Sequence, residues 1–162
     1  GMVLEFRRVL FRSLACVGLI QPFEGYHKRL ADGRCCAYPD PGTGREPWTI
    51  GWGSTGPDIT ETSIWTREQA DDALYAEATQ KATKLLVLSP DLLDEPERRF
   101  SALISFAYNC GLGNYRVSTL RKRVNNKDWI GAVEQIVKWN KANGRVMMGL
   151  IQRRNAEAML LR

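Results

Sequence analysis

The sequence has few residues that could bind a metal ion. Its 162 residues include one histidine, and its four cysteines show no C-x-x-C or Cys/His spacing. Zinc sites are built from clustered Cys and His ligands, so we expect no metal and no cofactor. We expect free thiols, as in a reducing compartment, at Cys16, Cys35, Cys36 and Cys110. Alternatively, Cys35 or Cys36 could form a disulfide with Cys16 or Cys110.

The sequence also lacks a long apolar run. Its longest candidate, residues 14–20, is seven residues long, far short of the roughly 20 that cross a bilayer. No small-residue cleavage site of a signal peptide follows it. We therefore expect no integral membrane segment. Residues 1–13 begin with Gly-Met and hold three arginines without periodicity, so we interpret them as a tag remnant or a disordered, non-native arm before a single domain at 14–162.

The charge of the chain is moderately positive. Lys and Arg number 23 against 18 Asp and Glu, a net charge of +5, and the basic pairs are spread along the chain. Nucleic acid and the anionic bacterial envelope would both suit this charge, and so would solubility without any partner. Because no basic helix-turn-helix or zinc-finger pattern appears, nucleic-acid binding is disfavoured.

The pattern along the chain predicts one small β-sheet among helices. Apolar spacing over residues 14–26 indicates a first helix, interrupted or started near Pro22, that ends at Gly25. The Gly- and Pro-rich residues 32–56 indicate a small sheet with tight turns. Thr66 and Gln69 form a capping box at the start of a long helix. The later helices are predicted at residues 96–110, 119–124, 129–138 and 150–161.

Two carboxylates and a hydroxyl lie in or near the glycine-rich segment. Glu24 precedes Gly25 at the predicted helix end, Asp40 lies in a Pro-Asp-Pro turn, and Thr49 lies in a short strand. Taken singly, each is more often structural than functional, Asp40 as the cap of its own turn. Two carboxylates across a groove can nevertheless cleave a glycosidic bond, one as acid and one activating a water. His27 is interpreted as an exposed residue rather than a base.

The order of several motifs resembles the phage-type lysozymes, glycoside hydrolase family 24, over residues 14–162. The motifs are Glu24-Gly25, Ala37-Tyr38-Pro39-Asp40-Pro41, Trp48-Thr49-Ile50-Gly51-Trp52-Gly53, Phe106-Ala107-Tyr108-Asn109-x-Gly111, Trp139-Asn140-Lys141 and Gly149-Leu150-x-x-Arg153-Arg154-x-x-Glu157. The resemblance implies an α+β, mainly α fold: a lobe with a small β-hairpin, a long connecting helix and a helical C-terminal lobe.

The resemblance also implies a function. Glu24 would be the proton donor, Asp40 would activate a water, and Thr49 would orient it, in a muramidase that hydrolyses the β-1,4 bond of peptidoglycan with inversion. It places substrate-binding side chains at Tyr108, Asn109, Thr119 and Gln135. It implies a monomeric endolysin with peptidoglycan and no nucleic acid as partner, made in the bacterial host cytoplasm and acting on the cell wall in the periplasm or outside.

The sequence departs from the family pattern in the hairpin region. Glu24 and Asp40 are sixteen residues apart, wider than in most members, so Asp32 is an alternative second carboxylate. We favour Asp40 because it alone lies in a Tyr-x-Asp-Pro context. Residues 43–47 form a further insertion, and Ser54 stands where many members have histidine.

Two other functions are compatible with parts of the sequence. One is an inactive peptidoglycan-binding protein of the same fold, against which the presence of all three candidate catalytic residues argues. The other is a basic helical protein that binds nucleic acid.

In the C-terminal half, Trp139 is predicted to be a core aromatic, and Arg153, Arg154 and Glu157 are predicted to form ion pairs on a helix surface.

Overall fold

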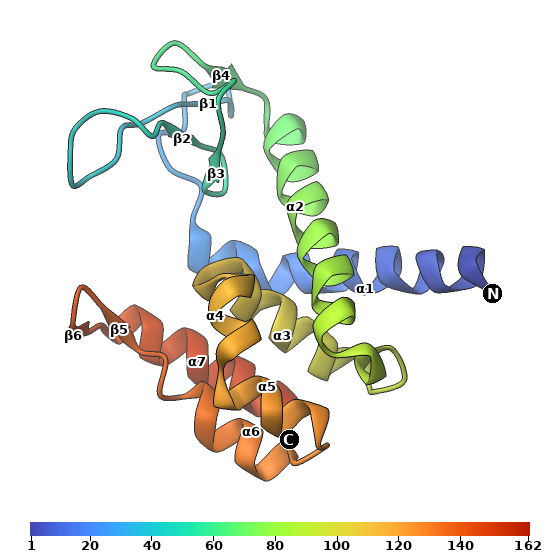
Figure 1. The fold of residues 1–162 in the computed structure, drawn as a ribbon. Coiled ribbons are helices and arrows are strands. Elements are labelled where there is room, and N and C mark those ends of the chain that lie inside the picture. The colour runs from blue at the N-terminus through green and yellow to red at the C-terminus, as the bar shows by residue number, and fades with distance from the viewer. The chain divides into compact units, whose positions relative to one another are not determined.

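The computed structural model describes the backbone of residues 1–162 and all side chains except those of residues 5, 6 and 9–15. The chain folds into two compact units. Residues 20–76 form what we call the hairpin unit, and residues 1–19 together with 77–162 form the helical unit. Each unit is described on its own. Figure 1 traces the course of the chain through both.

The first helix, α1 (Met2–Glu24), is longer than predicted. We expected it to begin near Leu14, but the helix begins at Met2. Near its start, the Arg8 guanidinium lies 3.7 Å from the Asp94 carboxylate within the helical unit. The helix ends where the sequence predicts, because Gly25 adopts a positive φ of 72°, which disfavours any side chain. The domain boundary at residue 14 stays a prediction.

The hairpin unit contains two separate two-stranded antiparallel sheets, where the sequence predicts one small sheet within residues 32–56. The strand at residues 64–65 lies outside that segment. Strand β1 (Cys35–Cys36) pairs with β4 (Ile64–Trp65), and β2 (Thr49–Ile50) pairs with β3 (Ser54–Thr55). An isolated bridge between Tyr38 and Thr49 adds a further antiparallel contact beside β2. The fold class, mostly helical with small antiparallel sheets, is confirmed.

Helix α2 (Arg67–Leu88) starts at the predicted capping box. The Gln69 N–H donates to Thr66 Oγ1 at 3.1 Å, and the Thr66 N–H donates to Gln69 Oε1 at 2.8 Å. The β2–β3 turn packs directly on the first turns of this helix. A Cβ on Gly51 would lie 2.9 Å from the Ala70 Cβ, so the approach requires a residue without a side chain.

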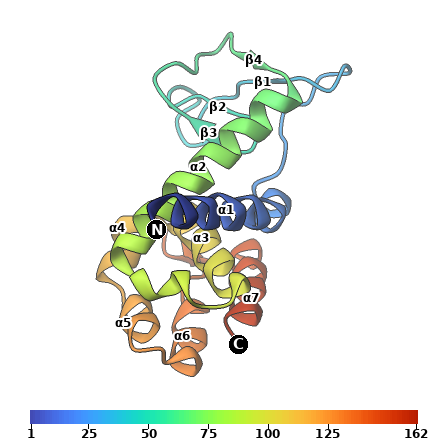
Figure 2. The ribbon, with the colours of Figure 1, turned by 90° about the vertical axis from the view of Figure 1, so that its right-hand side faces the viewer.

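The helical unit is built from short helices around a buried segment of α3. Its remaining elements are η1 (Pro90–Leu93), α3 (Glu97–Cys110), α4 (Leu112–Val117), α5 (Thr119–Asn125), α6 (Trp129–Ile136), β5 (Lys141–Ala142), β6 (Arg145–Val146) and α7 (Met148–Leu161). Helix α3 packs against α7, which in turn packs against α6 (Figure 2). Phe100, Leu103 and Ile104 are fully buried, which confirms the predicted apolar face of α3.

Within the described part of the chain, no helix is both long enough and apolar enough to span a bilayer.

Candidate functional site

Glu24 lies at the C-terminal end of α1 and is half-buried. The turn between β2 and β3 approaches its carboxylate closely. A Cβ on Gly53 would lie 3.2 Å from Glu24 Oε2, and Gly53 has a φ of 96°. A glycine is thus required here both by the backbone conformation and by the neighbouring carboxylate. The hairpin turn and the end of the helix meet at this carboxylate.

His27 contacts the C-terminal end of α1. Its Nε2 lies 3.1 Å from the Glu24 carbonyl oxygen, and its ring lies edge-on to Tyr38 with 5.7 Å between centroids. A Cβ on Gly25 would lie 2.8 Å from this Nε2, so a glycine permits the contact. His27 is exposed, as predicted, and it holds the chain that leaves the helix.

Tyr38 connects the Glu24 region to Thr49. Partial burial raises the pKa of the Tyr38 phenol, and the charge of Glu24 raises it further, so the phenol stays neutral at physiological pH. The Tyr38 and Thr49 backbones exchange two hydrogen bonds of 2.9 Å each. Thr49 is therefore paired with Tyr38, whose ring interacts electrostatically with Glu24.

Asp40, two residues after Tyr38, is half-buried and caps its own turn. Its Oδ2 accepts hydrogen bonds from the backbone N–H groups of Gly42 at 3.1 Å and Thr43 at 3.0 Å. This is the structural role that a Pro-Asp-Pro-Gly sequence favours. The turn holds the carboxylate in one place, two residues after Tyr38, which forms an isolated bridge to Thr49.

Asp32, the alternative second carboxylate, is bound within an exposed turn of its own. Its Oδ1 accepts from the Arg34 N–H at 3.1 Å, and its Oδ2 accepts from Arg34 Nε at 2.7 Å. These hydrogen bonds, first the backbone and then the side-chain one, hold the pKa of Asp32 below its ordinary value. Both of its oxygens therefore have a local partner two residues away.

The turn that approaches Glu24 is held on α2 by a polar network that the sequence analysis missed. Asp71 Oδ1 accepts hydrogen bonds from Trp52 Nε1 at 2.7 Å and from Arg67 Nε at 3.1 Å. The Arg67 guanidinium also lies over the rings of Trp52 and Tyr26, at 4.6 and 4.9 Å from their centroids. The i, i+4 spacing of Arg67 and Asp71 on the predicted helix could have indicated this ion pair.

Ser54 follows this turn and is buried beside Ile50, its partner across the hairpin. A serine hydroxyl can still donate a hydrogen bond at this position, where the family that the sequence resembles often has histidine. Among the side chains that the structure describes, Ser54 Oγ is one of the buried polar atoms that have no hydrogen-bond partner. An unpaired buried hydroxyl costs about 1–3 kcal/mol.

The four predicted substrate-binding residues lie in the helical unit, on three helices. Tyr108, half-buried, and Asn109, exposed, are near the end of α3, and Thr119 is the exposed first residue of α5. Gln135 is half-buried on α6. Asn109 Oδ1 accepts a weak hydrogen bond from the neighbouring Cys110 thiol at 3.6 Å. Their role in binding stays a prediction.

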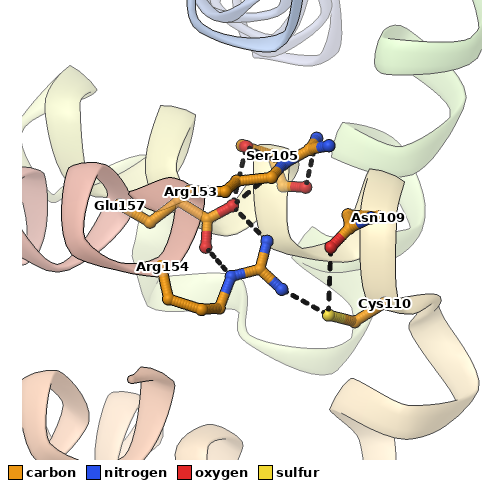
Figure 3. Close-up of polar contacts among 6 residues, drawn as sticks. All are labelled: Ser105, Asn109, Cys110, Arg153, Arg154 and Glu157. Carbon is orange, nitrogen blue, oxygen red and sulfur yellow. Dashed lines mark hydrogen bonds and ion pairs between the residues drawn. The ribbon is translucent and has the colours of Figure 1, made fainter. Parts of the chain in front are cut away.

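Arg153, Arg154 and Glu157 form a buried cluster, so the predicted surface location of this ion-pair pattern is wrong. The residues face α3 from α7, and their exposed fractions are 3%, 0% and 0%. The Glu157 carboxylate lies 2.7 Å from Arg154 Nε and accepts from the Ser105 hydroxyl at 2.8 Å (Figure 3). Burial raises the pKa of Glu157, while the two guanidiniums and the hydroxyl act to lower it.

Trp139 packs edge-on against Phe106 with 5.4 Å between ring centroids, in keeping with its predicted role as a core aromatic. All four cysteines are free thiols, two of them buried. Across the side chains that the structure describes, no group of three or more His, Cys, Asp or Glu residues is placed to hold a metal ion.

Comparison with known proteins places this geometry in context. A family model described as phage lysozyme matches residues 23–157. The endolysin of Bacillus phage PZA is 34% identical over 154 residues, which cover 91% of this chain and 54% of the phage protein. The chain thus spans about half the length of this curated relative.

Two solved structures share the fold over most of both chains. The muramidase domain of SpmX from Asticaccaulis excentricus has a TM-score of 0.69 and 29% identity, and the match covers 91% of this chain and 94% of that domain. The endolysin of Escherichia coli O157:H7 phage FAHEc1 has a TM-score of 0.71 and 28% identity, with 90% and 89% covered.

Proposed function

This chain belongs to the phage lysozyme family, and we propose that it is an endolysin-type muramidase. Its reaction is hydrolysis of the β-1,4 bond between N-acetylmuramic acid and N-acetylglucosamine in peptidoglycan. The observation that carries the proposal is the approach of the Gly53 turn to Glu24 Oε2, a half-buried carboxylate whose charge acts on Tyr38, the backbone partner of Thr49. A glycoside hydrolase needs such a positioned acid next to a second polar group.

In the proposed reaction Glu24 protonates the glycosidic oxygen as the bond to the anomeric carbon breaks. Asp40 takes a proton from a water that attacks this carbon from the opposite face, and the Thr49 hydroxyl orients that water. The product is inverted, because one displacement occurs with no covalent intermediate. The hydrogen bonds from Gly42 and Thr43 support the role of Asp40, since they fix its carboxylate before substrate binds.

Asp32 is the less suitable second carboxylate. Its ion pair with Arg34 would have to break before Asp32 could activate a water. Asp40 has its hydrogen bonds from the backbone, and both end on a single oxygen, Oδ2. We therefore assign the base role to Asp40.

The family membership supports a wider proposal. We propose that residues 14–162 form one catalytic domain that acts as a monomer on the bacterial cell wall, after synthesis in the host cytoplasm. Tyr108, Asn109, Thr119 and Gln135 would bind the glycan, and nucleic acid would not be a partner. The proposed reaction needs no cofactor, because proton transfer by carboxyl groups and attack by water are sufficient.

The substitution Glu24→Gln tests the central assignment. The amide is nearly isosteric but cannot donate a proton as the acid does, so we expect clearing of a peptidoglycan suspension to fall by about 10²–10⁴-fold. The thermal midpoint should stay unchanged. The exposed Glu68 on α2 provides a matched control, Glu68→Gln, which should clear at the wild-type rate. Clearing by Glu24→Gln at the wild-type rate would remove Glu24 from the mechanism.

Product analysis tests the reaction class. Hydrolysis by a muramidase leaves reducing-end muramic acid, and inversion makes the first-formed anomer α. Anhydro-muramic ends would instead indicate a lytic transglycosylase, and glucosamine ends would indicate cleavage of the other bond. An inactive wall-binding protein would sediment with peptidoglycan and release no ends.

A further inference from the structure

A groove in the hairpin unit remains outside the proposed mechanism. It consists of two adjoining hollows of about 810 and 690 Å³ that share Glu46 and Trp48. The first is lined by Thr43, Gly44, Arg45, Glu46, Trp48 and Glu61. The second is lined by Glu46, Pro47, Trp48, Thr55, Gly56, Pro57, Ile59 and Thr60. We call both hollows together the Trp48 groove.

One wall of the Trp48 groove is the insertion at residues 43–47, and hydrogen bonds organise this segment. Thr43 Oγ1 donates to the Glu46 carbonyl at 3.3 Å and accepts from the Arg45 N–H at 3.2 Å. The Gly44 N–H donates to the Asp40 carbonyl at 2.8 Å. The insertion is therefore a folded loop whose shape is set before any ligand arrives.

The second segment of the lining, residues 55–61, is organised in the same way. The Ile59 N–H donates to the Gly56 carbonyl at 3.1 Å, and the Thr60 N–H donates to Ser63 Oγ at 2.9 Å. Trp48 lines both hollows and is half-buried. Two segments ordered by their own hydrogen bonds, together with an aromatic ring, make a preorganised binding surface.

The chemistry of the lining selects among ligands. Arg45 is opposed by Glu46 and Glu61, so the charged groups sum to about −1 and do not attract a polyanion. Trp48, Pro47 and Ile59 offer apolar surface for the C–H face of a sugar ring and for an N-acetyl methyl group. The charged side chains can accept from and donate to sugar hydroxyls and amides.

We propose that the Trp48 groove is a saccharide subsite that binds an N-acetylhexosamine unit of a glycan strand. Trp48 stacks on the sugar ring, while Arg45 and Glu61 hydrogen-bond its polar groups. The identity of the glycan in this proposal rests on the muramidase function proposed above. It assigns a binding role to the insertion that lengthens this hairpin, and none of its contact residues belongs to the proposed catalytic set.

The test is a titration of the ¹⁵N-labelled protein with the tetramer of N-acetylglucosamine, followed through the indole N–H signals of its five tryptophans. Trp48→Phe identifies the Trp48 signal by its absence. We expect this signal to shift saturably, while that of Trp129 in the helical unit stays in place. Glu61 is exposed, and Glu61→Gln should weaken the binding about fivefold, because a neutral amide oxygen is a weaker acceptor than a carboxylate. The control Glu68→Gln should leave the binding unchanged.

Three results would overturn the subsite: a Trp48 signal that stays fixed while that of Trp52 moves, equal affinity in Glu61→Gln and wild type, or a response to a lysine-containing stem peptide but not to the saccharide. Clearing of peptidoglycan, measured in parallel, separates the two proposals. Clearing without a Trp48 response removes the groove alone. A Trp48 response without release of reducing ends supports the groove and removes the muramidase reaction.

Discussion

The carboxylates of the hairpin unit and those of the helical unit differ in burial and in their partners. In the helical unit, Glu157 is fully buried and ion-paired, and its partners Arg153 and Arg154 are buried with it. In the hairpin unit, Glu24 and Asp40 are half-buried, and Asp40 is bound by backbone N–H groups rather than by a charged partner. The first arrangement serves stability, since its charges satisfy each other away from water. The second leaves carboxylates accessible for chemistry on a ligand.

The largest test of this contrast is Arg154→Met. The substitution deprives Glu157 Oε2 of its guanidinium partner at 2.7 Å. Removing one member of a buried ion pair costs about 3–5 kcal/mol of unfolding free energy, which urea titration at neutral pH would measure. Arg116→Met, at an exposed position on α4, should change stability by less than about 0.5 kcal/mol. An Arg154→Met protein with the unfolding free energy of the wild type would contradict a stabilising role for this cluster.

The same variant has a defined pH dependence. Burial raises the pKa of Glu157 above its ordinary value, so the stability linked to its protonated form is present below the ordinary pKa and lost as pH rises through the raised one. Without Arg154, which lowers that pKa, the effect is larger. The deficit of Arg154→Met should therefore be smaller near about pH 5 than at about pH 7. Adding Glu157→Gln to Arg154→Met should recover stability at neutral pH.

The next test compares Asp40→Asn with Asp32→Asn in the hairpin unit. We expect Asp40→Asn to lower the rate of peptidoglycan hydrolysis about 10²-fold, because an amide cannot accept the proton of the attacking water. Its thermal midpoint should change little, since the amide oxygen can still accept from Gly42 and Thr43. Asp32→Asn should hydrolyse peptidoglycan near the wild-type rate. The opposite ranking would move the second carboxylate to Asp32.

A smaller effect is expected at Asp71, which acts through Trp52 and touches no part of the proposed reaction. Asp71→Ala removes the acceptor for Trp52 Nε1 and Arg67 Nε and loosens the turn against Glu24. We expect kcat to fall about tenfold with KM nearly unchanged, because misplacement of a reacting group lowers the rate of the chemical step. Asp71→Asn, which keeps an acceptor for the indole, should restore most of kcat. The exposed neighbour Asp72→Ala is the control.

The smallest expected effect is at Ser54, whose buried hydroxyl is a polar group of the hairpin unit without a partner among the described side chains. Replacing an unpaired hydroxyl with a methyl group removes its desolvation cost. Ser54→Ala should therefore raise the unfolding free energy by about 1 kcal/mol or leave it unchanged. A loss of stability in a thermal scan would indicate that the hydroxyl has a partner in solution.

Features that depend on neighbours in the sequence were predicted well. The capping box at Thr66 and Gln69 forms as expected, and α1 ends at Gly25, because both follow from hydrogen bonds and dihedral angles within a few residues. The start of α1 at Met2 was not predicted, since residues 3–13 show no helical periodicity. The i, i+4 pair of Arg67 and Asp71 was open to prediction, but its contact with Trp52 joins segments nineteen residues apart.

The sequence by itself determined where α1 ends and where α2 begins, because both depend on local backbone chemistry, and its motif order marked the family. Only the tertiary structure decided that Arg153, Arg154 and Glu157 are buried, that Gly53 lies against Glu24, and that the insertion at residues 43–47 forms one wall of a groove. The physical reason is that burial and the partners of a charge come from segments distant in the chain. A pattern of charges on a helix is the same whether it faces water or another helix.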